Sequence, residues 1–294
     1  MKAALLPDRG IVKVAGETAR QFLNGLLTAD ITKVTPERPG FAALLTPQGK
    51  IVVDCIVVEQ PTSEGGGFLL DCPRALAGEL VDKLKFYRLR AKVTFDDLSG
   101  ALGVLAFWGG SCRTAVGLVY PDPRLPELGS RVVLPPERAG DAAAELGAEL
   151  VEADAYEAHR IALGVPRGGV DFAYGDAFPH ETDMDQLNGV DFAKGCFVGQ
   201  EVVSRIEHRG SARKRIVQVT ADGVAPEAGL PVTAGDKQIG TMGSAVGAQG
   251  LAMLRLDYIA EAQASGAPIV AGGVPIRPRK PAWARFDWPQ KAAE

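Results

Sequence analysis

The alternation of apolar and polar positions predicts a chain that mixes strands with helices. Short apolar or alternating runs bounded by turn residues are typical of strands, and they occur at residues 11–14, 41–45, 51–58, 68–71, 102–108 and 131–134. Apolar residues recur at helical spacing over 16–27, 73–84, 137–150 and 152–163. We therefore predict a fold of the α+β class.

The pattern changes after residue 210, where helical spacing gives way to turns. Short strands are predicted at 216–220, 231–234, 238–242, 251–256, 268–270 and 274–277. Evenly spaced short strands with no helix between them predict a small β-barrel at the C-terminal end. The residues beyond 288 are expected to form a solvated tail.

A long irregular segment leads into the stretch that carries the most chemistry. Residues 165–191 are rich in Gly, Pro and Asp, and a loop of this length is often functional. It runs into Lys194-Gly195-Cys196-Phe197-Val198-Gly199-Gln200-Glu201, and Arg205 follows on an amphipathic segment. Two glycines bracket the cysteine, so we predict a tight turn and then a helix that ends at Gly210.

This stretch allows two interpretations. The N-terminus of a helix carries partial positive charge, which favours an ionised thiol beside it, and Lys194 would add to that effect. A lone cysteine is also commonly a small buried hydrophobic residue, and a Gly-rich turn before a helix needs no ligand. The residues alone leave both interpretations open.

Composition narrows the classes of function. A net charge of −4 and a pI near 5.6 argue against wholesale nucleic-acid binding, so any anion site must be local. The four cysteines (Cys55, Cys72, Cys112 and Cys196) lack a CxxC pair, which argues against a zinc ribbon, a self-contained cluster site or a disulfide framework. The three histidines are scattered without metal-ligand spacing, so no stably bound metal is expected.

The chain shows no targeting or membrane pattern. Its first apolar run is too short for a signal peptide, and no stretch approaches the roughly 20 apolar residues of a membrane span. We therefore predict a cytoplasmic protein with no membrane partner.

The cysteine stretch resembles the signature of the YgfZ family, the folate-binding relatives of the glycine-cleavage T-protein that include a mitochondrial iron–sulfur assembly factor. That signature runs Lys-Gly-Cys-Tyr/Phe-x-Gly-Gln-Glu-x-x-Ala/Ser-Arg, and residues 194–205 meet every specified position. The resemblance extends from residue 11 to about residue 256 and includes Leu-Leu-Thr-Pro-Gln-Gly-Lys-Ile at 44–51. Asp183 departs from it, because Asn is expected there.

The resemblance implies a T-protein-like arrangement of three parts around a central channel of folate size. A first α+β domain would combine residues 1–45 with 150–212 and carry the cysteine motif. Residues 46–149 would form a ferredoxin-like α+β domain, and residues 213–294 the C-terminal β-barrel.

The resemblance also implies a site for tetrahydrofolate or a derivative, with Cys196 as the functional thiol. The expected cofactor-binding residues are Lys194, Gly195, Phe197, Gly199, Gln200, Glu201, Arg205 and Arg213. Arginine offers a bidentate fork for the carboxylates of the glutamate tail. Phe172, Tyr174 and Phe178 are candidate walls for the pterin, or ordinary core residues.

The implied role is that of an accessory protein which supports assembly or repair of iron–sulfur clusters, with assembly proteins and client enzymes as partners. The alternative is a folate-dependent aminomethyltransferase like the T-protein, which carries a glutamate in an Arg-x-Glu-x-Gly run. Here the run is Arg160-Ile161-Ala162-Leu163-Gly164, with Ala162 in place of the glutamate, and no convincing second carboxylate follows Asp71. A non-enzymatic maturation role is therefore favoured. One cysteine cannot hold a cluster that needs about four protein ligands, so any cluster would be shared with another protein or bound only transiently.

Overall fold

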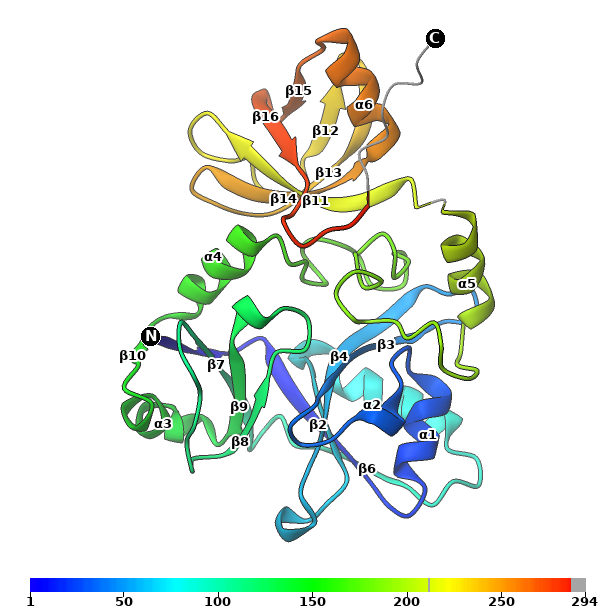
Figure 1. Ribbon diagram of the computed structural model, residues 1–294, viewed down its shortest axis with the longest axis vertical. Helices are drawn as coiled ribbons and strands as arrows, with labels where there is room; N and C mark the ends of the chain where they lie inside the picture. Colours follow the sequence, from blue (N-terminus) through cyan, green and yellow to red (C-terminus); the bar gives the residue numbers. More distant parts are fainter. Residues whose placement is uncertain (211, 287–294) are drawn as a thin grey trace. The chain divides into compact units, whose positions relative to one another are not determined.

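The computed structural model describes residues 1–210 and 212–286 and shows a mixed α+β chain (Figure 1). The chain divides into two compact units. The first unit comprises Met1–Tyr156 with Leu187–Gln200, and the second comprises Glu157–Gln186 with Glu201–Glu294. Each unit is therefore assembled from two separate stretches of the sequence.

One antiparallel sheet of the first unit has the strand order β3-β4-β5-β2-β6. Its strands are β3 (Gly40–Leu45), β4 (Ile51–Glu59), β5 (Phe68–Pro73), β2 (Arg9–Ala15) and β6 (Thr94–Asp97). Helices α1 (Ala19–Leu26) and α2 (Ala77–Tyr87) bury Leu23, Leu80 and Leu84 in the same core as this sheet. Apolar residues at helical spacing thus give each helix one face for the core.

The other sheet of the first unit has the order β10-β1-β7-β9-β8. Its strands are β10 (Glu149–Leu150), β1 (Lys2–Leu6), β7 (Gly103–Trp108), β9 (Ser130–Leu134) and β8 (Leu118–Pro121). Helix α3 (Ala139–Glu145) buries Ala142 and Ala143 against Phe107 and its neighbours. Short 3₁₀ turns lie at Ile31–Lys33, Thr62–Glu64, Arg74–Leu76, Pro126–Leu128 and Pro136–Arg138.

Strand pairing divides the chain differently from the expected domain boundaries. The boundary expected between residues 45 and 46 falls inside one hairpin, because β3 and β4 pair with Leu45 opposite Ile51. The expected ferredoxin-like domain of residues 46–149 contributes β4, β5 and β6 to one sheet and β7, β8 and β9 to the other. Local periodicity predicts strands, but it does not show which sheet each strand joins.

A buried ionic network connects the two sheets of the first unit. Asp71 on β5 is fully buried, with Arg9 Nε at 2.6 Å and Arg131 Nη1 on β9 at 2.5 Å. The Tyr120 hydroxyl on β8 donates to the same carboxylate at 3.0 Å. Burial acts to raise the pKa of Asp71, but the two guanidinium groups outweigh it and lower that pKa. Asp71 is therefore an ionised structural residue.

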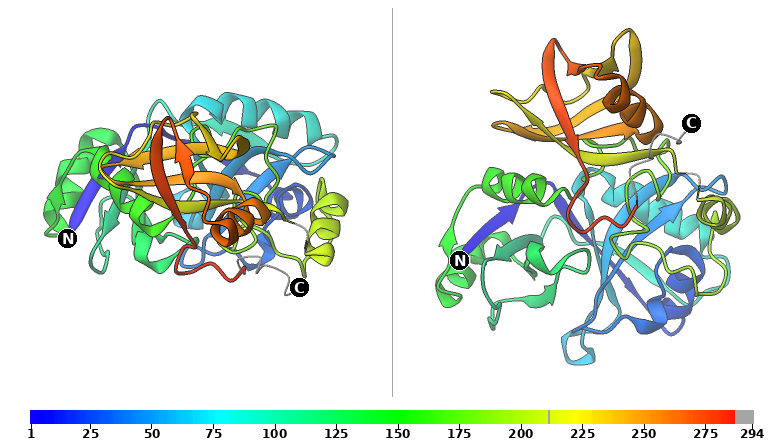
Figure 2. Two further views of the ribbon diagram at one scale, coloured as in Figure 1. Left: turned by 90° about the horizontal axis from the view of Figure 1, so that it is seen from above. Right: turned by 45° about the horizontal axis from the view of Figure 1, so that its top comes forward.

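The second unit contains a closed barrel with the strand order β11-β14-β13-β12-β15-β16. Its strands are β11 (Lys214–Ala221), β14 (Gln249–Arg255), β13 (Lys237–Val246), β12 (Pro231–Ala234), β15 (Ile269–Ala271) and β16 (Val274–Arg279). Figure 2 shows the barrel from two further directions. The predicted barrel is confirmed, and the tail expected beyond residue 288 lies outside the described residues.

The expectation that no helix interrupts the barrel strands is wrong. Helix α6 (Leu256–Ser265) follows β14 directly and ends at Gly266, which has φ +70°. Leu256, Ile259 and Ala262 recur every third residue and are buried in the barrel core. The helical spacing was present in the sequence, but the apolar run before it indicated a strand that continued through residue 256.

Helices α4 (Ala153–Leu163) and α5 (Gln200–Arg209) flank the long irregular segment. In the second unit, buried Arg160 anchors this segment: its guanidinium donates to Asp171 at 2.9 Å and to the hydroxyl of Ser244 on β13 at 2.7 Å.

No helix among the described residues is long and apolar enough to span a membrane.

Candidate functional site

The cysteine motif forms an irregular turn that leads into α5, as predicted. Cys196 is exposed, whereas Lys194 and Phe197 on either side of it are buried. The N–H of Gly210 donates to the carbonyl of Glu207 at 3.0 Å, and Gly210 adopts φ +57°. The predicted end of the helix at Gly210 is therefore confirmed, and the turn leaves the thiol open to solvent.

Lys194 anchors the motif to the end of α1. Its Nζ donates to the backbone carbonyls of Asn24 at 2.7 Å, Leu27 at 2.6 Å and Ala29 at 2.8 Å. The last carbonyls of a helix lack partners within the helix, so the lysine caps α1. Burial lowers the pKa of Lys194 to about 8, so at pH 7 the group stays mainly protonated and has three N–H donors. The amine also lies 5.3 Å from the ring centroid of Phe197. Lys194 therefore has a structural role and is directed at the backbone instead of a ligand.

Lys194→Met is expected to lower the free energy of unfolding by about 2–4 kcal/mol, because partly buried carbonyls lose their donor. Urea unfolding measures this change. Lys85→Met on α2, where the lysine is 57% exposed, is the matched control with an expected change within about 0.5 kcal/mol. Equal losses in the two variants would contradict the capping role.

Gly199 is the glycine that the turn requires. It adopts φ +81°, and a Cβ at this position would lie 2.6 Å from the carbonyl oxygen of Thr46 and 3.0 Å from the Cα of Gly49. Thr46 and Gly49 belong to the turn of the β3–β4 hairpin. Within the first unit, the stretch 44–51 therefore meets the part of the cysteine motif that ends at Gly199.

Gly199→Ala is expected to destabilise the protein by about 2–4 kcal/mol, because a Cβ adds both backbone strain and a contact with the hairpin turn. The chain supplies its own control in Gly195→Ala, since a Cβ at Gly195 meets no atom within 4 Å. We expect the control to change the melting temperature little, and thermal unfolding of both variants is the measurement. Similar melting temperatures for the two variants would show that the hairpin contact is unimportant.

Among the residues that the structure describes, those predicted to bind the cofactor do not line a common cavity of either unit. Glu201 and Arg205 form an exposed ion pair on α5 at 2.6 Å, with side chains 84% and 55% accessible. Gln200 is the first residue of that helix, and Arg213 is exposed and lines a cavity of the second unit. Of the candidate pterin walls, Phe172 is buried and packs edge-on against Tyr174, and Phe178 lines a smaller cavity.

A cavity whose lining residues the sequence does not predict lies beside the motif within the first unit. Its volume is about 700 Å³, and its lining comes from residues 29–41, 121–123 and 188–193, so it ends three residues before Cys196. Phe41 and Phe192 supply aromatic surface, and Lys33 Nζ lies 2.7 Å from Asp191 and 3.1 Å from Asp30. No local pattern reveals this cavity, because three separate segments form it.

The run that holds the T-protein glutamate has a structural function here. Arg160 is 2% exposed and pairs with Asp171 and Glu157. Ala162 is exposed, and its carbonyl accepts a hydrogen bond from Gln218 at 2.7 Å. Neither this run nor Asp71 therefore offers a free carboxylate for aminomethyl transfer.

The fold places the chain in a known structural class. Over 96% of its length it matches the glycine cleavage system aminomethyltransferase T from Bartonella henselae, with a TM-score of 0.75, coverage of 86% of that chain and 16% identity. The chain thus has the fold of the T-protein class, which confirms the expected α+β architecture with a C-terminal barrel.

Sequence comparison then identifies the family. Residues 213–286 match the profile of the CAF17 C-terminal beta-barrel domain. The chain is 33% identical over 274 residues to the human mitochondrial iron–sulfur cluster assembly factor IBA57, covering 85% of this chain and 76% of that protein. The Pyricularia oryzae homolog is 33% identical over 294 residues, with coverage of 90% and 75%. The chain belongs to the family of IBA57 iron–sulfur cluster assembly factors, within the wider group of YgfZ and CAF17 proteins.

The match to the Mycosarcoma maydis homolog is 36% identical over 231 residues, and it spans 74% of this chain but 57% of that protein. These relatives are named as mitochondrial proteins. The predicted cytoplasmic location is therefore wrong. Unpaired cysteines and the lack of a secretory pattern do not distinguish the cytoplasm from another reducing compartment.

Proposed function

We propose that this protein supports the assembly or repair of iron–sulfur clusters in client enzymes, with Cys196 as its functional thiol. The observation that carries the proposal is the exposure of Cys196 in a turn held by Lys194 and Gly199. The names of its relatives as iron–sulfur cluster assembly factors support the same role.

The other cysteines are poorly suited to bind iron, because a thiol must ionise to become a ligand. Burial raises the pKa of Cys55 well above its ordinary value, that of Cys72 to about 12 and that of Cys112 to about 11. Among the residues that the structure describes, the one group of three or more potential metal ligands does not include Cys196. A cluster bound at Cys196 therefore takes its remaining ligands from a partner protein.

Activation of an apo-[4Fe–4S] enzyme by a cluster-donor protein tests the assembly role. We expect this protein to increase the yield of active enzyme under anaerobic conditions. Equal yields with and without the protein would contradict the proposal.

We also propose that the protein binds tetrahydrofolate or a derivative. The cavity beside the motif supports this, because about 700 Å³ is within the usual range of ligand pockets. Phe41 and Phe192 offer apolar walls for a flat pterin, and Asp30 offers carboxylate acceptors for its N–H groups. Lys33 and Arg38 line the same cavity and supply cations for a glutamate tail.

Calorimetric titration with reduced folates tests this ligand. Phe192→Ala is expected to weaken binding about tenfold, since an aromatic contact contributes about 0.5–1.5 kcal/mol beyond its buried area. Phe86→Ala is the control, because Phe86 is exposed and lies outside the cavity. No saturable heat with the wild-type protein, or equal affinities for the two variants, would refute folate binding in this cavity.

Aminomethyl transfer is the second candidate, and the T-protein fold favours it. The exposed Ala162 and the ion-paired Asp71 argue against it, because neither position supplies a free carboxylate like the glutamate in the corresponding run of the T-protein. We expect no folate-dependent release of ammonia from an aminomethyl donor. A turnover rate above that of a heat-inactivated sample would reverse this assignment.

A further inference from the structure

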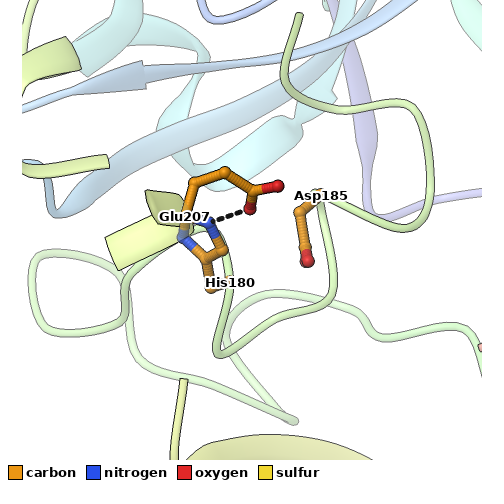
Figure 3. A group of neighbouring side chains, drawn as sticks. All are labelled: His180, Asp185 and Glu207. Atoms are coloured by element: carbon orange, nitrogen blue, oxygen red, sulfur yellow. Dashed lines mark hydrogen bonds and ion pairs between the residues drawn. The ribbon is translucent and has the colours of Figure 1, made fainter. Parts of the chain in front are cut away.

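Three side chains that could bind a metal ion meet at the wall of a cavity within the second unit. The cavity has a volume of about 490 Å³. His180 and Asp185 come from the irregular segment, and Glu207 comes from α5 (Figure 3). One potential ligand atom of each residue lies within 4.8 Å of the other two, and His180 Nε2 is 3.0 Å from Glu207 Oε2.

These distances between potential ligand atoms are compatible with the binding of one shared metal ion. Ligands at about 2.0–2.2 Å from a metal lie about 3–4.4 Å from one another, so small side-chain shifts would complete the geometry. An imidazole and two carboxylates are suitable ligands for a divalent cation, and the positive charge of Arg215 offsets one of the two carboxylates. His180 is 2% exposed and the Asp185 side chain 4%, so two ligands are fixed by packing. Glu207 is 45% exposed and free to adjust.

Arg215 on β11 holds the buried part of this group in position. Its Nη1 and Nη2 each lie 2.9 Å from one oxygen of Asp185, and Nη1 also donates to the backbone carbonyl of His180 at 2.9 Å. A carboxylate has about four lone-pair positions, so the arginine leaves positions open for a metal. Metal-binding carboxylates are commonly oriented by such hydrogen bonds. Arg213 and Arg285 also line the cavity, and Asp257 adds an acidic group.

We propose that His180, Asp185 and Glu207 form a binding site for a divalent first-row transition-metal ion, with water from the cavity in its remaining positions. Nitrogen and oxygen ligands without sulfur favour Mn²⁺, Fe²⁺ or Zn²⁺ over Cu⁺. The imidazole favours these ions over Ca²⁺ and Mg²⁺, which prefer oxygen ligands. The site stands independently of Cys196 and of the proposed role in cluster assembly. This proposal differs from the expectation of no stably bound metal, which rested on the spacing of the cysteines and histidines in the sequence.

A purely structural pair is the competing explanation, in which His180 and Glu207 only join α5 to the irregular segment by a hydrogen bond. Binding of Mn²⁺ distinguishes the two explanations, and Mn²⁺ is a suitable probe because it prefers oxygen ligands over thiolates. The test uses the full chain with Cys196→Ser, so that the exposed thiol does not compete. Loss of the free Mn²⁺ signal in electron paramagnetic resonance measures binding.

We expect one Mn²⁺ per chain, and at least about tenfold weaker binding in Glu207→Gln, which keeps a hydrogen-bond acceptor for His180. Glu201→Gln is the control, because Glu201 lies on the same helix and is 84% exposed. Mn²⁺ should also raise the melting temperature of the control but not that of Glu207→Gln. Equal Mn²⁺ affinity in the two variants, or no binding at millimolar Mn²⁺ by the control, would overturn the proposal.

Discussion

Cys196→Ser is expected to reduce the rate at which an apo-[4Fe–4S] client enzyme is activated by at least about tenfold. A tenfold reduction corresponds to about 1.4 kcal/mol. Serine keeps the size of the side chain but replaces the thiolate that binds iron with a poorly ionised hydroxyl. Because Cys196 is exposed, the substitution should change the stability of the fold little, so a folding defect would not explain the lost activation. The initial rate at which client activity returns is the measured quantity.

Cys112→Ser is the matched control for this variant. Cys112 is partly buried, and burial raises the pKa of its thiol to about 11, so it ionises less readily than an ordinary thiol. We expect the control to activate the client at the wild-type rate. A Cys196→Ser protein that is as active as the control would exclude the thiol from the function.

Asp71→Asn is expected to cause the largest loss of stability, about 3–5 kcal/mol, because it leaves Arg9 and Arg131 buried without their shared counter-charge. Chemical denaturation at pH 7 measures the loss. Asp82→Asn on α2 is the control, since that side chain is 81% exposed, and its effect should stay within about 0.5 kcal/mol.

The loss of stability in Asp71→Asn should depend on pH. The pKa of Asp71 is lower in the folded protein than its ordinary value of 3.8, so its stabilising effect is complete above that value. The effect is lost as the pH falls toward the folded-state pKa. The stability difference between wild type and Asp71→Asn should therefore shrink below about pH 4. A constant difference between pH 2 and pH 7 would contradict the ionic role of Asp71.

Local patterns in the sequence predict the local parts of the fold well. The hairpin of β3 and β4, the helix α4 and the turn that leads into α5 all follow from spacing and turn residues over a few positions. These patterns do not predict the strands β1, β6, β8 and β10 or the helix α6, and β10 lies within the helix expected at 137–150. The alanine-rich β1 alternates weakly, and α6 follows a strand with no turn residue between them. The division of strands between two sheets depends on distant pairing, which periodicity does not encode.

The candidate site shows the same limit. The motif indicated the exposed thiol and the turn around it, but not that Lys194 binds carbonyls about 170 positions earlier in the chain. The resemblance places Arg213 among the cofactor-binding residues, yet Arg213 lines a cavity of the second unit. His180 and Glu207 are 27 residues apart, so no metal-ligand spacing linked them. Sequence proximity therefore identified the reactive group but not the residues that surround it.

The most direct test of a shared cluster at Cys196 is native mass spectrometry of this protein mixed anaerobically with a cluster-loaded donor protein. We predict a complex that contains both chains and the mass of one cluster, and the loss of this species with Cys196→Ser. A cluster held tightly by this protein alone, or an unchanged complex with Cys196→Ser, would contradict it.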